Sequence, residues 1–348
     1  MTRSPSDQEN ASAASILSRA LQWKEAGDEV ALATIVKAWA TAPRRAGAQM
    51  AVRRDGTTIG TVFGPGVDAQ VASAAVEALA VGDDRTVSID ITDATASNAG
   101  MACGGEMQIR FECLRSGPAG QVDILREAMD ALKDRRSVVL CTRLSDGRRS
   151  LISSDDPGVD AWAPEARRRA MADDTAITEV AGDDVLFQVF NAPLRLYVVG
   201  AVRTARALLA AAQLVGFEVS ILDPRPEFAS ALDFTGARLL VGDAAGALRE
   251  ARLDSRCAVV MLSHSSGIDD PALIEAVASK AFYVGALGSR RSHAARLERL
   301  ADAGVPPRLS KRIHGPAGLD IGAMGPAEIA ASIVAEMITA LRKSSPGE

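Results

Sequence analysis

The segment "RLYVVGAVRTARALLAAAQLVGFEVSILDPR" (195–225) decides the fold of the C-terminal half. A short apolar strand ends at Gly200, an alanine- and leucine-rich helix follows, and a second apolar strand ends at Asp223. This order of strand, glycine, helix and strand is typical of a nucleotide-binding unit. The glycine fingerprint G-x-G-x-x-G is incomplete, because Val202 and Ala205 replace its second and third glycines.

The same alternation of strands and helices continues through the C-terminal half. Strands are expected at "RLYVVG", "EVSILD", "ARLLVG", "CAVVMLSH" and "AFYVGALG", with the clearest helices at "TARALLAAAQLVG" and "DPALIEAVASK". Right-handed βαβ units of this kind build a parallel sheet, so we predict a Rossmann-like domain over residues 193–343. Ligands of such sheets bind beyond the carboxyl ends of the strands, and candidate residues are sought there.

The N-terminal half has a different pattern of strands, hairpins and scattered helices. "RTVSIDITD" and "EMQIRFECL" alternate apolar and polar residues, and Asp55-Gly56 predicts a hairpin turn. Helices are expected at about 12–26, at 67–80 and at "QVDILREAMDALKD". This mixture predicts an α+β domain, and the fold class of the whole chain is therefore α/β with two different domains.

Composition sets the boundaries of these domains. Residues 1–12 are polar and are expected to form a disordered tail, followed by the α+β domain over 13–155. The stretch 156–192 starts with several Asp, Pro and Gly residues and is expected to be a linker or bridging segment. Pro193 marks the start of the C-terminal domain.

Bulk composition excludes several classes of protein. A length of 348 residues favours two domains. A net charge of −5 and only 4% aromatic residues argue against nucleic acid or an anionic membrane as partner. The four cysteines include no close C-x-x-C pair, so neither a structural zinc site nor a disulfide framework is expected. With no apolar signal segment at the start, a cytoplasmic protein is expected.

Several candidate binding residues lie at the ends of the first two C-terminal strands. Gly200 allows the tight turn into a helix whose free amide groups attract anions. Asp223 follows Gly200 by 23 residues, the approximate spacing of an acid that contacts a ribose hydroxyl. Arg203 is placed to bind a phosphate, and Arg225 completes this set. The alternative is a Rossmann-like fold that binds no NAD.

The later strand ends carry a second set. His264 follows the fourth strand, where either a binding role or a structural role fits it. Gly288 and Ser289 stand where a helix should begin, and Arg290 and Arg291 follow them. A glycine turn, an N-cap serine and two arginines make a cradle for an anion. Alternatively, both arginines are solvated surface charges.

In the N-terminal half, "GMACGGEMQ" (100–108) is the most unusual segment. Cys103 precedes Gly104 and Gly105, and two glycines let a ligand approach the backbone closely. A cysteine in such a loop is a candidate metal ligand or nucleophile. The alternative is a small buried residue at a bulge. The other three cysteines lie in apolar strands and are expected in the core.

Together these stretches resemble the XdhC/CoxI family, the accessory proteins of xanthine dehydrogenase and related molybdenum hydroxylases. The resemblance covers about residues 28–342. It rests on "APRRAGAQMAV" (42–52), "GTVFGPGVD" (60–68), "GMACGGEM" (100–107), "PLRLYVVGAVRTARAL", "SILDPRPEFA", "KAFYVGALGSRRSHAARLERL" (280–300) and "RIHGPAGLDIGAMGPAEIAASIVAE" (312–336).

The resemblance implies an accessory chaperone rather than an enzyme. Members bind the molybdenum cofactor, protect it, help it to acquire a sulfido ligand through a cysteine desulfurase, and deliver it to the apo-hydroxylase. It implies molybdopterin or its cytosine dinucleotide form as cofactor, a homodimer, and Cys103 as a contact to molybdenum. Two other functions remain open, an NAD(P)-dependent oxidoreductase and an assembly scaffold that has lost its cofactor site.

This chain departs from the family pattern at three places. Where the family reads G-G-C-V-E, residues 64–68 read G-P-G-V-D, so Gly66 replaces a cysteine and Asp68 replaces a glutamate. Arg203 stands where the family usually has a histidine, and Ser265 replaces the acid that commonly follows His264. Cys103 is the remaining motif cysteine. These departures favour cofactor binding without sulfuration, or the scaffold.

Overall fold

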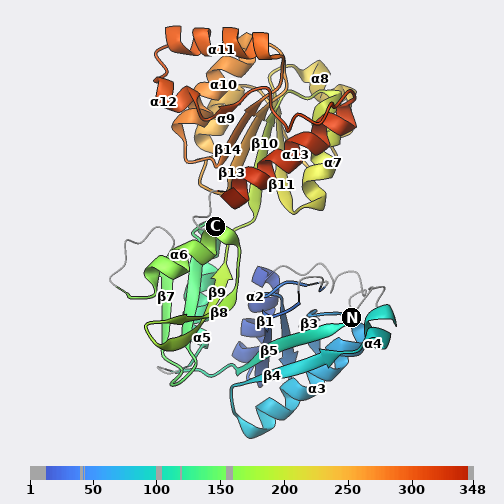
Figure 1. The fold of residues 1–348 in the computed structure, drawn as a ribbon, viewed down its shortest axis with the longest axis vertical. Coiled ribbons are helices and arrows are strands. Elements are labelled where there is room, and N and C mark those ends of the chain that lie inside the picture. The colour runs from blue at the N-terminus through green and yellow to red at the C-terminus, as the bar shows by residue number, and fades with distance from the viewer. Residues whose placement is uncertain are drawn as a thin grey trace. The chain divides into compact units, whose positions relative to one another are not determined.

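The computed structural model describes residues 13–39, 42, 44–98, 104–117, 120–153 and 160–343. It divides into two compact units, Met1–Ala192 and Pro193–Glu348, which we treat separately (Figure 1). None of the described helices is long and apolar enough to cross a membrane.

The N-terminal unit begins with an antiparallel sheet of strand order β3-β2-β1-β5-β4. Its strands are β1 (Val30–Lys37), β2 (Gln49–Arg53), β3 (Thr58–Gly60), β4 (Arg85–Ile91) and β5 (Gly105–Cys113). The predicted hairpin is confirmed, since Arg53 donates its amide to Thr57 O across the Asp55-Gly56 turn. Short helix α4 (Asp93–Asn98) follows β4.

Helices cover both faces of this sheet. On one face, α3 (Pro65–Val81) packs Val71 and Ala75 against Ile109 and Phe111 of β5. On the other face, α2 (Ala13–Glu25) and α5 (Val122–Lys133) contribute apolar residues to a second cluster that includes Leu32 of β1. The alternation expected for "EMQIRFECL" is therefore not seen in the burial of β5, where Ile109 to Cys113 are all buried.

A second antiparallel sheet completes the N-terminal unit, in the order β7-β6-β9-β8. It contains β6 (Val138–Arg143), β7 (Arg149–Ser153), β8 (Ala176–Val180) and β9 (Asp183–Phe190), with α6 (Ala163–Ala172) packed on it. The expected bridging segment 156–192 is corrected here. Its described part forms α6, β8 and β9, because β9 pairs with β6 along its length and lies inside the sheet.

A buried polar cluster joins the two sheets of this unit. Gln188 of β9 donates to Thr34 Oγ1 at 3.4 Å and to Glu112 Oε2 at 3.2 Å. Arg149 lies 3.4 Å from Asp84 and 3.7 Å from Glu112. Burial raises the pKa of Glu112, while the charges of Arg149 and Arg110 oppose this. Residues from both sheets thus depend on each other for their hydrogen bonds.

The C-terminal unit is a parallel sheet of six strands in the order β12-β11-β10-β13-β14-β15, which confirms the predicted Rossmann-like fold. The strands are β10 (Leu194–Val199), β11 (Phe217–Asp223), β12 (Arg238–Val241), β13 (Cys257–Met261), β14 (Tyr283–Ala286) and β15 (Ile313–His314). The two-residue β15 was not predicted. Cys113, Cys141 and Cys257 are buried, as expected.

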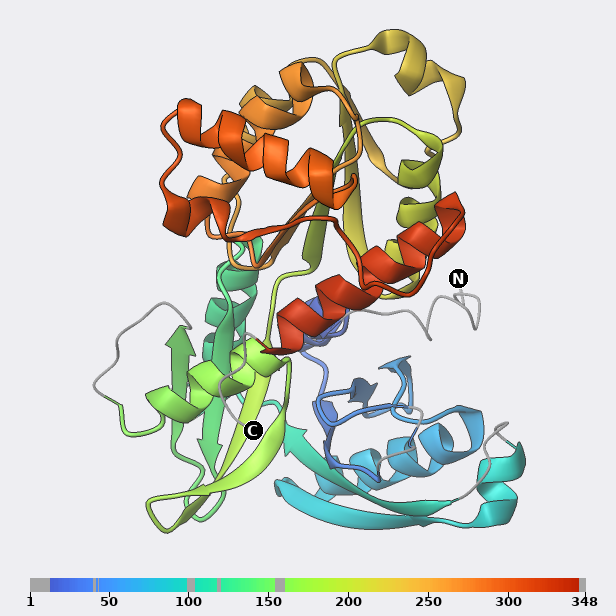
Figure 2. The ribbon, with the colours of Figure 1, turned by 45° about the horizontal axis from the view of Figure 1, so that its top comes forward.

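Helices flank this sheet on both faces. On one face, α7 (Arg203–Leu214) and α13 (Pro326–Lys343) lie side by side (Figures 1 and 2). The other face is covered by α9 (Ala244–Glu250), α10 (Ser266–Ala278) and α11 (Arg290–Asp302). Two short helices, α8 (Pro226–Ala231) and α12 (Pro307–Ser310), complete the unit.

The strand order places a topological switch point between β10 and β13. The chain runs outward from β10 through β11 to β12, then returns to form β13 on the other side of β10. In open α/β sheets the crevice at such a point, beyond the carboxyl ends of the strands, is where ligands bind.

Candidate functional site

At the switch point, the backbone packs closely around Gly200, which follows β10. This residue has φ +111°, and a Cβ added to it would lie 2.6 Å from Ser263 N and 2.7 Å from Ser263 Cα. Backbone atoms cannot yield as a flexible side chain does. Glycine is therefore required because the chain leaving β13 packs directly on the turn that leaves β10.

Asp223 supports the same turn from the end of β11. It is fully buried, and its Oδ2 accepts the Ala201 amide at 2.7 Å. Arg225 donates Nε to Oδ1 and Nη2 to Oδ2, both at 2.8 Å, and its guanidinium stacks on Phe228. Burial alone would raise the pKa of Asp223, but hydrogen bonds from Arg225 and from the Ala201 amide hold it below its usual value. Both carboxylate oxygens are thus engaged within the turn.

Two helices begin at the switch point without a side-chain cap. Val202 precedes α7 and Ser265 precedes α10, and neither side chain accepts a hydrogen bond from the first turn. The first amides of a helix have no partner within it, so these two ends favour an anion. Arg203, the first residue of α7, is exposed beside them.

His264 lies three residues after β13 and immediately before Ser265, the N-cap of α10. It is exposed and has φ +59°, a conformation that L-residues adopt uncommonly. Its neighbour Ser263 is fixed by donating to the buried carboxylate of Asp269 at 2.7 Å. Gly200, Asp223, Arg225 and His264 are therefore brought to one edge of the sheet.

The turn after β14 has the predicted glycine and N-cap serine, but both arginines that follow are exposed. Ser289 caps α11 by accepting the Ser292 amide at 3.1 Å, as the sequence predicted. Arg290 pairs with Asp320 at 3.4 Å, and both side chains are almost fully exposed. Arg291 is exposed too. These two positions match the alternative of solvated surface charges.

Arg296, which was not among the residues expected from the sequence, lies behind this turn. It is only 6% exposed and donates Nη2 to Leu287 O at 2.9 Å. Arg296 and Leu300 are the buried residues of α11, spaced four apart on one helical face. An arginine at a core-facing position of an amphipathic helix was the signal available in the sequence.

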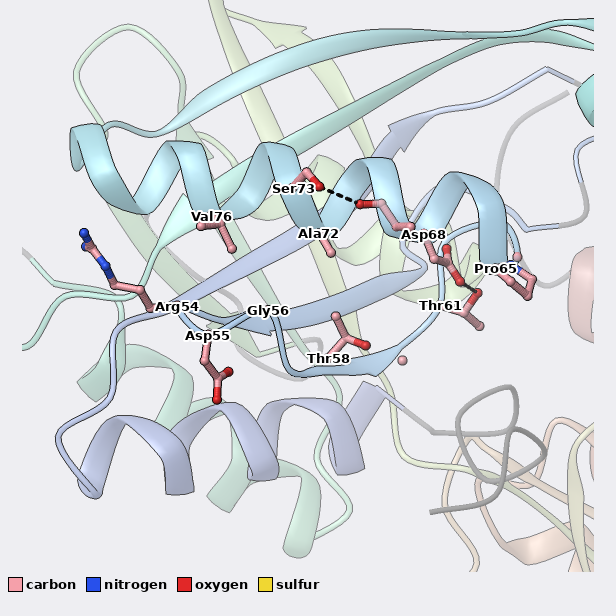
Figure 3. A pocket seen from close by; sticks show the side chains of 13 residues that line it. Arg54, Asp55, Gly56, Thr58, Thr61, Pro65, Asp68, Ala72, Ser73 and Val76 are labelled. Atoms are coloured by element: carbon pink, nitrogen blue, oxygen red, sulfur yellow. Dashed lines mark hydrogen bonds between the residues drawn. The ribbon is translucent and has the colours of Figure 1, made fainter. Parts of the chain in front are cut away.

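The N-terminal unit contains a groove of about 760 Å³ between the β2–β3 hairpin and α3 (Figure 3). Ala72, Ser73 and Val76 of α3 form one wall, and Thr58 lies on the opposite side. At one end, Asp68 accepts the amides of Val62 and Phe63 at 3.0 Å and the hydroxyl of Thr61. Asp68 thereby fixes the loop that leads into α3.

Comparison with known families assigns both units. The profile of the XdhC Rossmann domain matches residues 196–337, and the profile of the XdhC and CoxI family matches residues 23–90. The chain belongs to the XdhC and CoxI family. The matched ranges fall in the C-terminal and N-terminal units, respectively.

Two bacterial relatives match nearly the whole chain. The molybdenum cofactor insertion chaperone PaoD of Escherichia coli is 28% identical over 322 residues, which are 92% of this chain and 86% of PaoD. A Bacillus subtilis protein, named as a probable subunit of xanthine dehydrogenase, is 26% identical over 321 residues, 89% of this chain and 93% of that protein. A crystal structure of a xanthine dehydrogenase from Bacillus halodurans shares the fold, with a TM-score of 0.64, 23% identity, and 94% and 96% of the two chains covered.

Gly66, where the family resemblance implies a cysteine, is open to solvent. Gly66 is exposed in the first turn of α3, and a Cβ added to it would meet nothing within 4 Å. A cysteine there would sit at a helix N-terminus, which lowers a thiol pKa. Packing therefore does not require a glycine at this position.

The second family motif is described only in part. Cys103 lies outside the described residues. Gly104 donates its amide to Asp93 Oδ1 at 2.8 Å, and a Cβ on it would lie 1.9 Å from Ile91 O. A Cβ on Gly105 would lie 2.6 Å from the Trp39 ring. Both glycines are thus required by close packing, and within the described ranges no group of three His, Cys, Asp or Glu residues is placed to hold a metal.

Proposed function

We propose that this chain binds the molybdenum cofactor and delivers it to an apo molybdenum hydroxylase. The observation that carries the proposal is its similarity to the insertion chaperone PaoD along 92% of the chain. The edge of the C-terminal sheet supports it, because the uncapped ends of α7 and α10 suit the phosphate groups of molybdopterin or of its cytosine dinucleotide form.

The NAD(P)-dependent oxidoreductase is the weaker alternative. Dinucleotide binding in Rossmann folds uses an acid at the end of the second strand to hold a ribose. Asp223 occupies that position but is engaged with Ala201 and Arg225. Gly200, the first fingerprint glycine, is packed against Ser263. The carboxylate of Asp223 is therefore not available to a ribose, and Val202 replaces the second glycine, the residue that lets the backbone approach a pyrophosphate.

The sulfuration step is a separate matter from cofactor binding. A cysteine desulfurase is the partner for that step in the family resemblance, and Gly66 removes one of the two motif thiols. We therefore propose delivery of cofactor as the retained role, with Cys103 as the remaining candidate contact to molybdenum. The homodimer also remains a proposal.

The test is a direct comparison of ligands. We expect the purified protein to retain molybdopterin at micromolar concentrations in ultrafiltration, followed by absorbance, and to restore activity to an apo-hydroxylase. NADH and NADPH serve as the competing ligands under the same conditions. Nicotinamide binding with hydride transfer would replace the proposal with an oxidoreductase, and retention of neither ligand would favour the assembly scaffold.

A further inference from the structure

Arg296 of α11 is a buried cation with few partners. Its side chain is 6% exposed and makes a hydrogen bond from Nη2 to Leu287 O. Across the described residues, Nε and Nη1 have no hydrogen-bond partner. Buried polar groups are satisfied in nearly all native structures, so these two nitrogens require an explanation.

The two nearby carboxylates, Asp269 and Asp270, accept hydrogen bonds from other side chains. Asp269 accepts the hydroxyl of Ser263 at 2.7 Å, and Asp270 holds Arg299 through two contacts of 2.6 and 3.0 Å. Both acids attract Arg296 electrostatically without a hydrogen bond to it. Burial lowers the pKa of the Arg296 guanidinium, although the charges of the two acids oppose this. A desolvated charge without a hydrogen-bonded counter-ion is costly in free energy.

The guanidinium lies beneath the turn between β14 and α11. Besides its bond to Leu287 O, Nη2 lies 3.8 Å from the point where Gly288 would carry a Cβ, and Gly288 has φ +145°. Ser289 satisfies the amides of Ser292 and His293. By helix geometry the amides of Arg290 and Arg291 face outward from the same turn.

We infer that the Leu287–Ser289 turn and the first amides of α11 bind a phosphoryl group, and that Arg296 supplies the compensating positive charge from inside. The inference rests on the proposed function, in which this group belongs to the molybdenum cofactor. The buried charge acts through a low-dielectric interior and is weakly screened, whereas the exposed Arg290 and Arg291 are screened by solvent and salt.

The chain offers a matched pair of substitutions on one helix. Arg296→Met removes the buried charge and keeps an apolar stem, while Arg299→Met removes the same charge from the exposed pair with Asp270. We expect Arg296→Met to weaken binding of inorganic phosphate and pyrophosphate at least about tenfold, because it removes a weakly screened buried charge. Arg299→Met should change it by less than about twofold. Isothermal titration and phosphorus NMR measure both.

Thermal melting separates this role from a structural one. Phosphate should raise the melting temperature of the wild type and Arg299→Met, and leave that of Arg296→Met unchanged. Arg296→Met also loses the hydrogen bond to Leu287 O and an attractive charge beside buried Asp269, so the melting shift caused by phosphate is compared within each variant. If Arg296→Met does not fold, Arg296→Lys serves instead, with intermediate phosphate affinity expected because a lysine lacks the guanidinium fork.

Phosphate binding that is equal in the wild type and Arg296→Met, or absent from the wild type, would overturn the inference. The probes also separate it from the proposed function. Arg296-dependent phosphate binding in a protein that does not retain molybdopterin would leave the anion site standing and reject the chaperone. Molybdopterin retained equally by all variants, with phosphate binding indifferent to Arg296, would reject the anion site alone.

Discussion

Asp223 is a fully buried carboxylate whose partners lie in two turns, the one after β10 and its own after β11. It accepts the Ala201 amide and, from Arg225, the backbone amide and two guanidinium nitrogens. Sequence spacing alone suggested a ribose contact. Spacing locates the end of the strand, but it does not show which groups donate hydrogen bonds to the Asp223 carboxylate. Similarly, the cap at Ser289 was predictable from local residues, whereas the burial of Arg296 depends on how α11 packs on α10.

We predict that Asp223→Asn lowers the free energy of unfolding by about 2 kcal/mol at pH 7, because it breaks a largely buried ion pair. The pKa of Asp223 is depressed in the folded state. Its stabilisation is therefore complete above the unfolded pKa of about 3.9 and is lost as the pH falls through the folded pKa. Urea unfolding at pH 7 and below pH 4 should show the difference from wild type shrinking.

The matched control is Asp302→Asn, which makes the same chemical change at an exposed position and should cost less than about 0.5 kcal/mol. If Asp223→Asn instead leaves stability unchanged and reduces molybdopterin retention, Asp223 contacts the ligand rather than the turn.

The helices and strands themselves were largely predictable from sequence periodicity. The strand–helix alternation after residue 193 specifies a parallel sheet because only crossover connections of that length join parallel strands. The role of the Gly200 turn was less accessible. Its glycine is required by Ser263, which lies 63 positions later and reaches the turn only because β13 pairs with β10.

We predict that Gly200→Ala lowers the free energy of unfolding by about 3 kcal/mol and weakens molybdopterin retention. The reason is that backbone atoms of Ser263 must move by the full overlap with the new Cβ. Gly216→Ala is the control for backbone strain alone, since Gly216 has φ +87° with nothing within 4 Å of a Cβ. It should cost about 1 kcal/mol and leave retention intact. Equal losses of unfolding free energy in the two variants would show that the backbone near Ser263 accommodates the new Cβ at little cost.

At the scale of the whole chain, the division into two units falls at Ala192 and Pro193. From the sequence, Pro193 was expected to start the C-terminal domain and 156–192 to form a linker or bridge. The segment was ambiguous because it starts with several Asp, Pro and Gly residues, and because β6, the partner of its strand at 183–190, begins 45 positions earlier in the chain. Local patterns cannot reveal that β9 is an interior strand of a sheet.

We predict that a fragment of residues 1–192 folds, whereas a fragment of residues 1–155 does not. The shorter fragment lacks β8 and β9, so β6 loses the partner that pairs with it from Val138 to Arg143. It also lacks Gln188, and Glu112 would then be left in the core without that donor. Circular dichroism, amide dispersion in NMR spectra and size-exclusion chromatography distinguish a folded unit from a collapsed or aggregated one.

Residues 193–348 provide the companion fragment, because their sheet carries its own apolar cores on both faces and is expected to fold alone. The fragments 1–155 and 1–192 differ in whether they contain β9, so comparing them measures what this strand contributes to folding. If the fragment 1–155 were folded and as stable as 1–192, then the pairing of β9 with β6 and the Gln188 contacts would contribute little. The bridging assignment would then be the better description of 156–192. An unfolded 1–155 beside a folded 1–192 would place the domain boundary at Pro193, because the strand that completes the second sheet would have been removed.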